Sequence, residues 1–279
     1  MDYSGNCWEI LSQVRYGLNE QSTALVNGTD TSGKFQNSEL IRHINNAQNH
    51  LWSILFNQFP EYFLTSASLS VSASVATLPS DCWRIKQILD SDGYNVNPIN
   101  VNQKHIASQQ GSGHLYYRYG NTIRIDADSV TETMTLWYYS RCRELDTGMT
   151  SAGGATSATL ATSAKAILSY YNNMKIENIT DSTNDTITAY TAARVATVTN
   201  TWAASKYYGI VSDLPEVIQP LIAQRAILTM KQSPRVPVAL TAGDMMIFNE
   251  ELKSGLQAFA GSLNSDMNVN GLFNDFESM

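Results

Sequence analysis

The stretch that decides the fold is residues 38–90, which read SELIRHINNAQNHLWSILFNQFPEYFLTSASLSVSASVATLPSDCWRIKQILD. Its first part carries apolar residues at steps of three and four, the period of one helix face, and Pro60 stands where such a helix would end. Ser38 is a residue type that caps helices. From Leu69 to Val75 apolar and polar residues alternate, as in a half-buried strand. The stretch therefore predicts a helix over residues 38–59, followed directly by β-structure.

Helical patterns also occur near both ends of the chain. Residues 6–18 carry a stripe of apolar side chains, and residues 242–262 carry another. Between them, Asp213-Leu-Pro-Glu is a helix-opening sequence, which predicts a helix over residues 213–232. Helices from the two ends can pack against one another. We therefore predict an α+β fold with a helical bundle built from residues 1–65 and 212–262.

The central residues are predicted to form two β-regions. Residues 66–146 alternate in period two and contain the turn pairs Asp92-Gly93 and Gly120-Asn121, which indicates an inserted antiparallel β-domain. Residues 147–211 begin with a Gly, Ala, Ser and Thr-rich segment and are predicted to be a second small β-module that projects outward. Residues 263–279 form a polar C-terminal tail.

The composition narrows the class of function. Only 15% of the 279 residues are charged, and the net charge is −7. A protein that reads nucleic-acid sequence needs a basic footprint, so this balance disfavours one. Three cysteines that lie far apart form no disulfide or zinc pattern, and no signal peptide or long apolar stretch indicates a membrane.

Residues that could carry chemistry have simpler explanations. His43 and His50 could share a helix face, but no third metal ligand has a matching spacing. Asp90 with Asp92, and Asp126 with Asp128, are close carboxylate pairs, and aspartates at strand ends commonly serve turns. The aromatic residues at 116–117 and 137–139 could stack nucleic-acid bases, but few basic residues accompany them, so sheet packing is the preferred interpretation.

Four stretches follow one another along the chain: ELIRHINNAQNHL (39–51), QFPEYFLTSASLSVSASVATLPSDCWRIKQI (58–88), YYRYGNTIRI (116–125) and TMTLWYYSRCREL (133–145). They contain the helix pattern Ile44-Asn45 with Ala47, the strand entry Leu78-Pro79-Ser80-Asp81 and a strand exit that ends at Glu144-Leu145. Leu214-Pro215-Glu216 opens a later helix. Together these stretches resemble the head-to-tail adaptor, or connector, proteins of short-tailed bacteriophages.

A second resemblance covers residues 150–211. Ile187 to Tyr190, Val195 to Val198 and Trp202 are similar to a β-module that recurs in phage particles. The usual Gly-rich centre of that module is replaced here by DSTND at residues 181–185, so the chain departs from the pattern there.

The first resemblance implies a structural virion protein that has no cofactor and is not an enzyme. It implies a homo-oligomeric ring, expected to be a dodecamer, between the portal protein and the tail. The ring would hold tail nozzle or fibre proteins and let DNA pass without specific binding during ejection. Such a protein belongs in the neck or tail of the virion and is assembled in the host cytoplasm. The alternative is a β-rich receptor-binding or fibre-binding module of a phage tail.

Two sets of contact residues follow from this interpretation. The tail carries three large apolar side chains near its end, Leu272, Phe273 and Phe276, which we expect to bind the portal. The β-module carries three aromatic residues, Tyr190, Trp202 and Tyr207, which we expect at the interface with a fibre or tail protein. We also expect that deletion of residues 150–206 leaves a soluble bundle.

Overall fold

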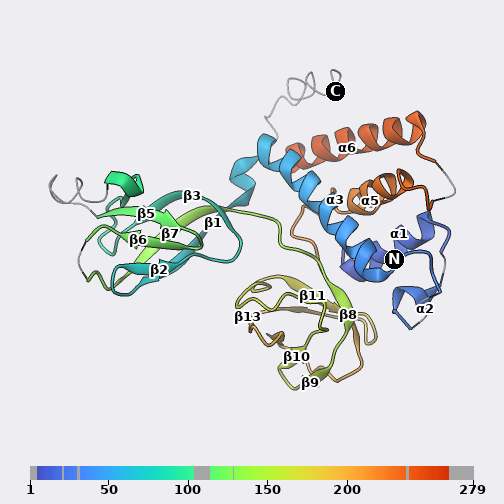
Figure 1. Ribbon diagram of the computed structural model, residues 1–279, viewed down its shortest axis with the longest axis horizontal. Coiled ribbons are helices and arrows are strands. Elements are labelled where there is room, and N and C mark those ends of the chain that lie inside the picture. Colours follow the sequence, from blue (N-terminus) through green and yellow to red (C-terminus); the bar gives the residue numbers. More distant parts are fainter. Residues whose placement is uncertain are drawn as a thin grey trace. The chain divides into compact units, whose positions relative to one another are not determined.

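The structure is a computed structural model that describes residues 5–20, 22–29, 32–103, 114–127, 129–236 and 239–263 (Figure 1). The fold is mixed α+β, as predicted, with five α-helices and several antiparallel sheets within these residues. The chain divides into two compact units. Unit 1 comprises Met1–Gln58 and Cys142–Met279, and unit 2 comprises Phe59–Arg141.

The helices belong to unit 1 and come from both ends of the chain. They are α1 (Cys7–Gly17), α2 (Thr23–Val26), α3 (Asn37–Gln58), α5 (Pro220–Lys231) and α6 (Ala242–Leu263). Helices α1 and α3 both pack against α5, and α5 packs against α6. Apolar side chains at helical spacing make this contact, and those of Ile10, Leu40, Ile44 and Ile222 are fully buried.

Helix α3 follows the sequence prediction closely but begins one residue earlier. It starts at Asn37, so Ser38 lies in the first turn and does not cap the helix. The side chain of Asn37 accepts hydrogen bonds from Arg15 and donates to the carbonyls of Leu25 and Val26. The helix ends at Gln58, and Pro60 opens the short 3-10 helix η1 (Pro60–Phe63).

Helix α5 begins later than the predicted residue 213. The amides of Ile218 and Gln219 donate to the carbonyl of Pro215, which closes a separate turn. Pro220 has no N–H group and therefore cannot continue that turn as a helix, but it is well suited to a first helical position. The helix thus starts at Pro220.

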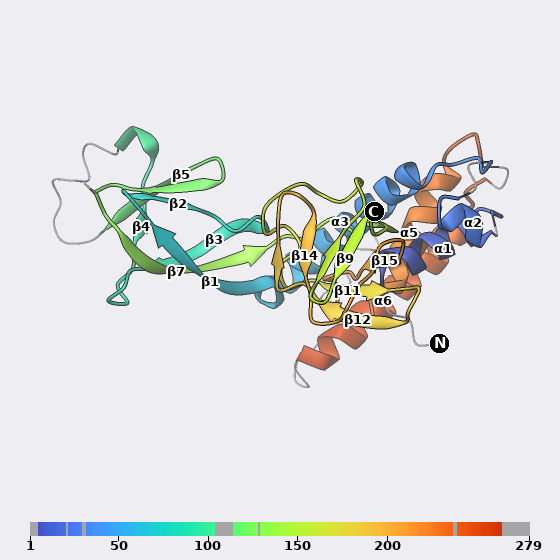
Figure 2. The same cartoon turned by 90° about the horizontal axis from the view of Figure 1, so that it is seen from below.

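Unit 2 contains two sheets, with strand orders β1-β7-β3 and β2-β6-β5-β4 (Figures 1 and 2). All pairs are antiparallel except β4 with β5. Buried residues of both sheets, including Leu136 and Ile123, form one core. The elements are β1 (Leu64–Val71), β2 (Val75–Thr77), β3 (Cys82–Leu89), β4 (Asn97–Pro98), η2 (Val101–Gln103), β5 (Leu115–Tyr119), β6 (Thr122–Ile125) and β7 (Glu132–Ser140).

The strands of residues 147–211 belong to unit 1 and form two further sheets, with orders β12-β11-β15-β8 and β13-β14-β10-β9. Strands β8 and β15 contact α1, which ties the first of these sheets to the helices. The strands are β8 (Thr147–Met149), β9 (Ala152–Gly154), β10 (Ser157–Thr159), β11 (Lys175–Asn178), β12 (Thr183–Thr186), β13 (Ala189–Tyr190), β14 (Val195–Thr197) and β15 (Tyr207–Ile210).

Candidate functional site

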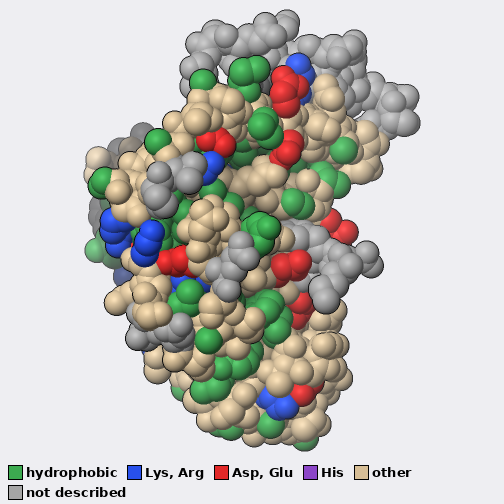
Figure 3. Space-filling view, turned by 90° about the vertical axis from the view of Figure 1, so that its right-hand side faces the viewer, with side chains coloured by type: hydrophobic (Ala, Val, Ile, Leu, Met, Phe, Trp, Pro, Cys, Tyr) green, Lys and Arg blue, Asp and Glu red, His purple; other side chains and the backbone are tan. Residues whose placement is uncertain are grey.

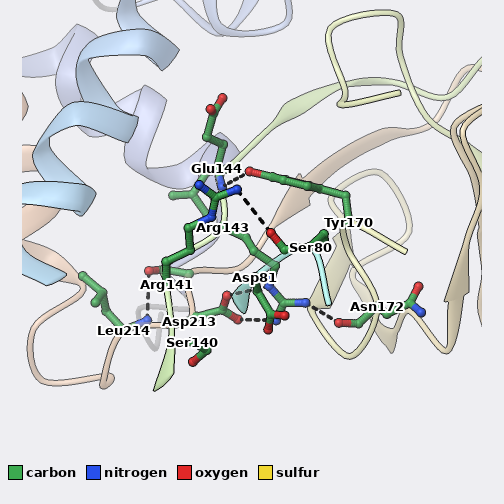
Figure 4. A network of polar contacts seen from close by, with 12 residues as sticks. Ser80, Asp81, Ser140, Arg141, Arg143, Glu144, Tyr170, Asn172, Asp213 and Leu214 are labelled. Carbon is green, nitrogen blue, oxygen red and sulfur yellow. Dashed lines mark hydrogen bonds and ion pairs between the residues drawn. The ribbon is translucent and has the colours of Figure 1, made fainter. Parts of the chain in front are cut away.

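A polar network joins three segments of unit 1 around Arg143 (Figure 4). The Arg143 guanidinium makes a two-pronged contact with Asp213, with Nε–Oδ2 and Nη2–Oδ1 distances of 3.0 and 3.1 Å. It also donates to the carbonyl of Asn172. The amide of Glu144 donates to the Tyr170 hydroxyl at 3.0 Å. The network therefore fixes the segment after β7 against residues 170–172 and the turn before α5.

The same segment is held on its other side by helix α3. Asn45 makes a reciprocal pair of bonds with Leu145: its Nδ2 donates to the Leu145 carbonyl at 3.0 Å, and its Oδ1 accepts from the Leu145 amide at 2.7 Å. Gln48 Nε2 donates to the Arg143 carbonyl at 2.8 Å. Buried amides need such partners. Two of the motifs singled out in the sequence, Ile44-Asn45 with Ala47 and the exit at Glu144-Leu145, therefore bind one another.

Asp146 follows directly and is a buried titratable group of unit 1. Its carboxylate accepts a hydrogen bond from the Tyr208 hydroxyl, which in turn accepts one from the Ala161 amide at 3.2 Å. Burial raises the pKa of Asp146 to about 6, and burial also raises the pKa of Tyr208 well above its usual range. The pair lies where β8 and β15 meet and joins these strands to residue 161.

The three aromatic residues predicted at an interface differ in their exposure to solvent. Tyr190 and Trp202 are 1% and 2% exposed, so both are core residues. The Trp202 indole donates to Asp185 at 3.0 Å, and the Tyr190 hydroxyl donates to the Lys165 carbonyl at 2.8 Å. Only Tyr207 keeps a partly accessible side chain. A role of Tyr190 and Trp202 at an interface stays a prediction. Because both side chains are buried, they could act there only by supporting residues that touch the partner.

Residues 166–169 form an exposed apolar loop that was not predicted from the sequence. Ile167 and Leu168 are 48% and 67% exposed. The base of the loop is tied down, because the Ser169 amide donates to the Tyr190 carbonyl at 2.8 Å and the Tyr190 hydroxyl bonds Lys165. Tyr190 also packs edge-to-face on Tyr171, with ring centroids 4.9 Å apart. Tyr190 therefore supports this loop from the core, and the Ala-Ile-Leu run in an otherwise polar segment was the signal available in the sequence.

The other sequence candidates also have places in the structure. Asp90 serves a turn, as predicted: its Oδ1 accepts from the amides of Asp92 and Tyr94 at 3.0 and 2.8 Å. Partial burial lowers the pKa of His43 and of His50. Among the described residues, no group of three His, Cys, Asp or Glu side chains is arranged to hold a metal ion. The described helices also include none long and apolar enough to cross a membrane.

The aromatic residues of β7 lie on both faces of its sheet. Tyr138 is buried and donates to Asp81 at 3.0 Å, whereas Tyr139 donates to Glu61 at 2.9 Å on the other face. Trp137 is 37% exposed. Sheet packing thus accounts for Tyr138. The predicted portal-binding residues Leu272, Phe273 and Phe276 lie outside the described residues.

The contacts around Arg143 and Asn45 hold backbone segments against one another, and Ile167 and Leu168 are exposed apolar side chains. The family model of the SU10 adaptor protein matches residues 9–164, which is more than half of the chain, and the chain therefore belongs to the SU10 adaptor protein family. The match includes Asn45, Arg143 and Leu145. No curated protein matches the chain. The family makes the chain a structural phage adaptor and a component of the virion.

Proposed function

We propose that the chain is the subunit of an oligomeric ring between the portal and the tail. The ring would enclose a DNA passage and hold tail nozzle or fibre proteins, without enzymatic activity. The observation that carries the proposal is the family match over residues 9–164, which contains the reciprocal bond between Asn45 and Leu145. The helices of both chain ends would act in the ring as one bundle.

The distribution of charge supports a DNA passage. Residues 1–58, 142–146 and 212–279, which include all the α-helices of the described residues, carry eight Lys or Arg and fifteen Asp or Glu, which is a net charge of −7. Residues 59–141 carry −1 and residues 147–211 carry +1. Repulsion between acidic walls and phosphates lets a duplex slide without being gripped. We propose that the helical segments line the passage. Tight duplex binding by the isolated chain that weakens steeply with salt would contradict this assignment.

The apolar loop supports the attachment of a tail protein. Figure 3 shows one face of the molecule, on which charged side chains are sparse over the strands of residues 147–211. Ile167 and Leu168 are two large aliphatic side chains on a loop whose base is already fixed by Tyr190. Preorganised apolar groups bind with a small entropic cost. We propose that this loop enters an apolar pocket of a nozzle or fibre protein.

The decisive experiment is electron microscopy of the purified chain with the portal protein of the same phage. Rings seated on the portal are the expected result. A chain that stays monomeric or trimeric and binds only a fibre protein would overturn the ring and favour the receptor-binding or fibre-binding alternative.

Residue-level tests follow for each attachment surface. Ile167→Ser with Leu168→Ser should leave the melting temperature unchanged and abolish binding of the nozzle or fibre protein, while Val217→Ser, a change at another exposed apolar residue of unit 1, should not weaken it. For the portal, truncation after Gly261 and the pair Phe273→Ala and Phe276→Ala should both weaken binding. Unchanged portal affinity in both variants would contradict the proposal that the C-terminal tail binds the portal.

A further inference from the structure

Strand β1 leaves one edge of its sheet unpaired, although β2, which follows the turn at Ser72–Val75, contacts β1 near its C-terminal end. It is eight residues long, and among the described residues β7 is the only strand that pairs with all of it. The sequence from Tyr62 to Ser80 contains no charged residue, and β1 itself contains no proline and no bulge. Figure 2 shows β1 at the margin of unit 2. Proteins normally protect such an edge, because its backbone groups can pair with another strand.

The backbone groups at this edge can be assigned to particular residues. The amide of Arg141 donates to the Asp81 carbonyl, which places the odd-numbered amides of β7 on the β3 side and the even-numbered ones on the β1 side. Tyr138, Leu136 and Met134 are opposite Thr65, Ala67 and Leu69, so these β1 residues bond to β7. The N–H and C=O groups of Ser66 and Ser68 therefore point to the free edge, and those of Ser70 point to the side on which β2 contacts β1. The bonds between Ser72 and Val75, on the side away from β7, agree with this alternation.

The opposite edge of the same sheet is protected. Strand β3 carries Arg84 and Lys86 and has two register shifts against β7. Two of its outer carbonyls already accept hydrogen bonds, that of Trp83 from Arg118 at 3.2 Å and that of Ile88 from the Val96 amide at 2.9 Å. One sheet thus has a charged, bulged and partly occupied edge on one side and an uncharged, regular and open edge on the other.

We propose that the free edge of β1 is a contact between copies of this chain, at which a neighbouring copy adds an extended strand to the sheet. The inference rests on the proposed function in that a ring supplies the neighbour. Charge favours a second copy as the occupant. Two chains of net charge −7 repel one another, and residues 59–141, with a net charge of −1, are a part through which they can approach. The free edge of β1 presents backbone N–H and C=O groups beside small serine side chains. An uncharged polypeptide strand can bind to such groups through its own backbone.

Substitutions at the edge test the proposal with a matched control. Ser66→Lys with Ser68→Lys places two charges on the free edge, on exposed side chains that leave the bonds to β7 in place. Thr133→Lys with Thr135→Lys places the same charges on the same face of the neighbouring strand, where Thr135 lies opposite Ser68. Ser68→Pro removes one edge N–H and is tolerable there because that N–H faces away from β7.

Mass photometry and residue-resolved hydrogen exchange give the readouts. We expect both edge variants to associate about tenfold more weakly than wild type or worse, and the Thr133 and Thr135 variant to assemble normally. In assembled wild type the amides of Ser66 and Ser68 should exchange slowly, and in dissociated chains they should exchange fast. Those of Thr65, Ala67 and Leu69 should be slow in both.

Two outcomes would separate this inference from the proposed function. Rings in which the amides of Ser66 and Ser68 still exchange fast, or which form equally well with either edge variant, overturn the strand pairing and leave the ring intact. A wild-type chain that never associates, alone or on the portal, overturns both.

Discussion

The two β-regions of this chain have different relations to the rest of the protein. Residues 59–141 form a compact unit with their own core, whereas the strands of residues 147–211 belong to the unit that contains the helices. Strands β8 and β15 contact α1, and Asp146 and Tyr208 join them to residue 161. A β-insert can therefore be a separate body or a part of the helical core, and strand patterning alone does not distinguish the two.

The largest expected effect comes from deleting each region in turn. Replacing residues 62–139 with a short Gly-Ser linker should leave a folded unit 1, because Leu64 and Tyr139 lie opposite one another at the ends of the removed segment. Deleting residues 150–206 should unfold the remainder, since β15 loses its partner β11 and the contact with α1 is left incomplete. Circular dichroism and thermal melting would measure both. A cooperative melt of the second deletion variant would show that residues 147–211 are the separate module that the sequence predicts.

A pair of tryptophans sharpens the comparison at the level of one side chain. Trp202→Ala should cost about 3–5 kcal/mol of unfolding free energy, because the indole is 2% exposed and its N–H group donates to Asp185. Trp83→Ala, in unit 2, removes a side chain that is 50% exposed and should cost less than about 1 kcal/mol. Urea denaturation measures both. Equal losses would contradict the burial that distinguishes these residues.

The third expected effect is a pH dependence at the joint between strands and helices. The pKa of Asp146 is raised to about 6, so unfolding is favoured by release of its proton as the pH rises from about 4 to about 6. Above that range the buried carboxylate lowers the free energy of unfolding by about 3 kcal/mol. Asp146→Asn should therefore stabilise the protein at pH 7.5 and leave it unchanged at pH 4, because the amide oxygen still accepts from Tyr208.

The control for this prediction has the opposite sign. Hydrogen bonding to Lys206 lowers the pKa of Asp181, so its contribution to stability is present near neutral pH and is lost as the pH falls. Asp181→Asn should therefore give no gain at pH 7.5. Denaturation at pH 4, 5, 6 and 7.5 separates the two variants, and an Asp146→Asn protein no more stable than wild type at pH 7.5 would refute the assignment.

Helix α3 and the strands β6 and β7 lie where the sequence predicts a helix and β-structure, because their apolar residues follow a single period over several positions. The predictions from the sequence were wrong where a turn interrupts the pattern of apolar residues. Ala73 continues the alternation of β1 in the sequence, yet it adopts a left-handed conformation with φ of 47° and makes a turn. Within the predicted β-region of residues 147–211, Tyr170 and Tyr171 lie in turns and Asn173 has φ of 65°. Within the predicted β-domain, residues 94–99 contain only the two-residue strand β4, which pairs with β5.

The interface residues were the hardest to predict, for a physical reason. An aromatic side chain is as suitable for a core as for a binding surface, and sequence alone does not tell which side of a strand faces inward. Tyr190 and Trp202 are in the core, while the exposed apolar pair, Ile167 and Leu168, stands in a loop without any period. The reciprocal bond between Asn45 and Leu145 also joins residues a hundred positions apart, which only the folded chain brings together.

The way the chain enters and leaves unit 2 has a mechanical consequence. The first pair of the β1–β7 ladder is Leu64 with Tyr139, so both connections to unit 1 leave the paired strands at the same end. A pull that separates the units acts first on the contacts of Glu61 with Tyr139 and of Phe63 with Ser140, and then on successive pairs of the ladder, as in opening a zipper, instead of shearing all the bonds at once. Unit 2 is thus attached at one end of this ladder, where the pairs separate stepwise under tension.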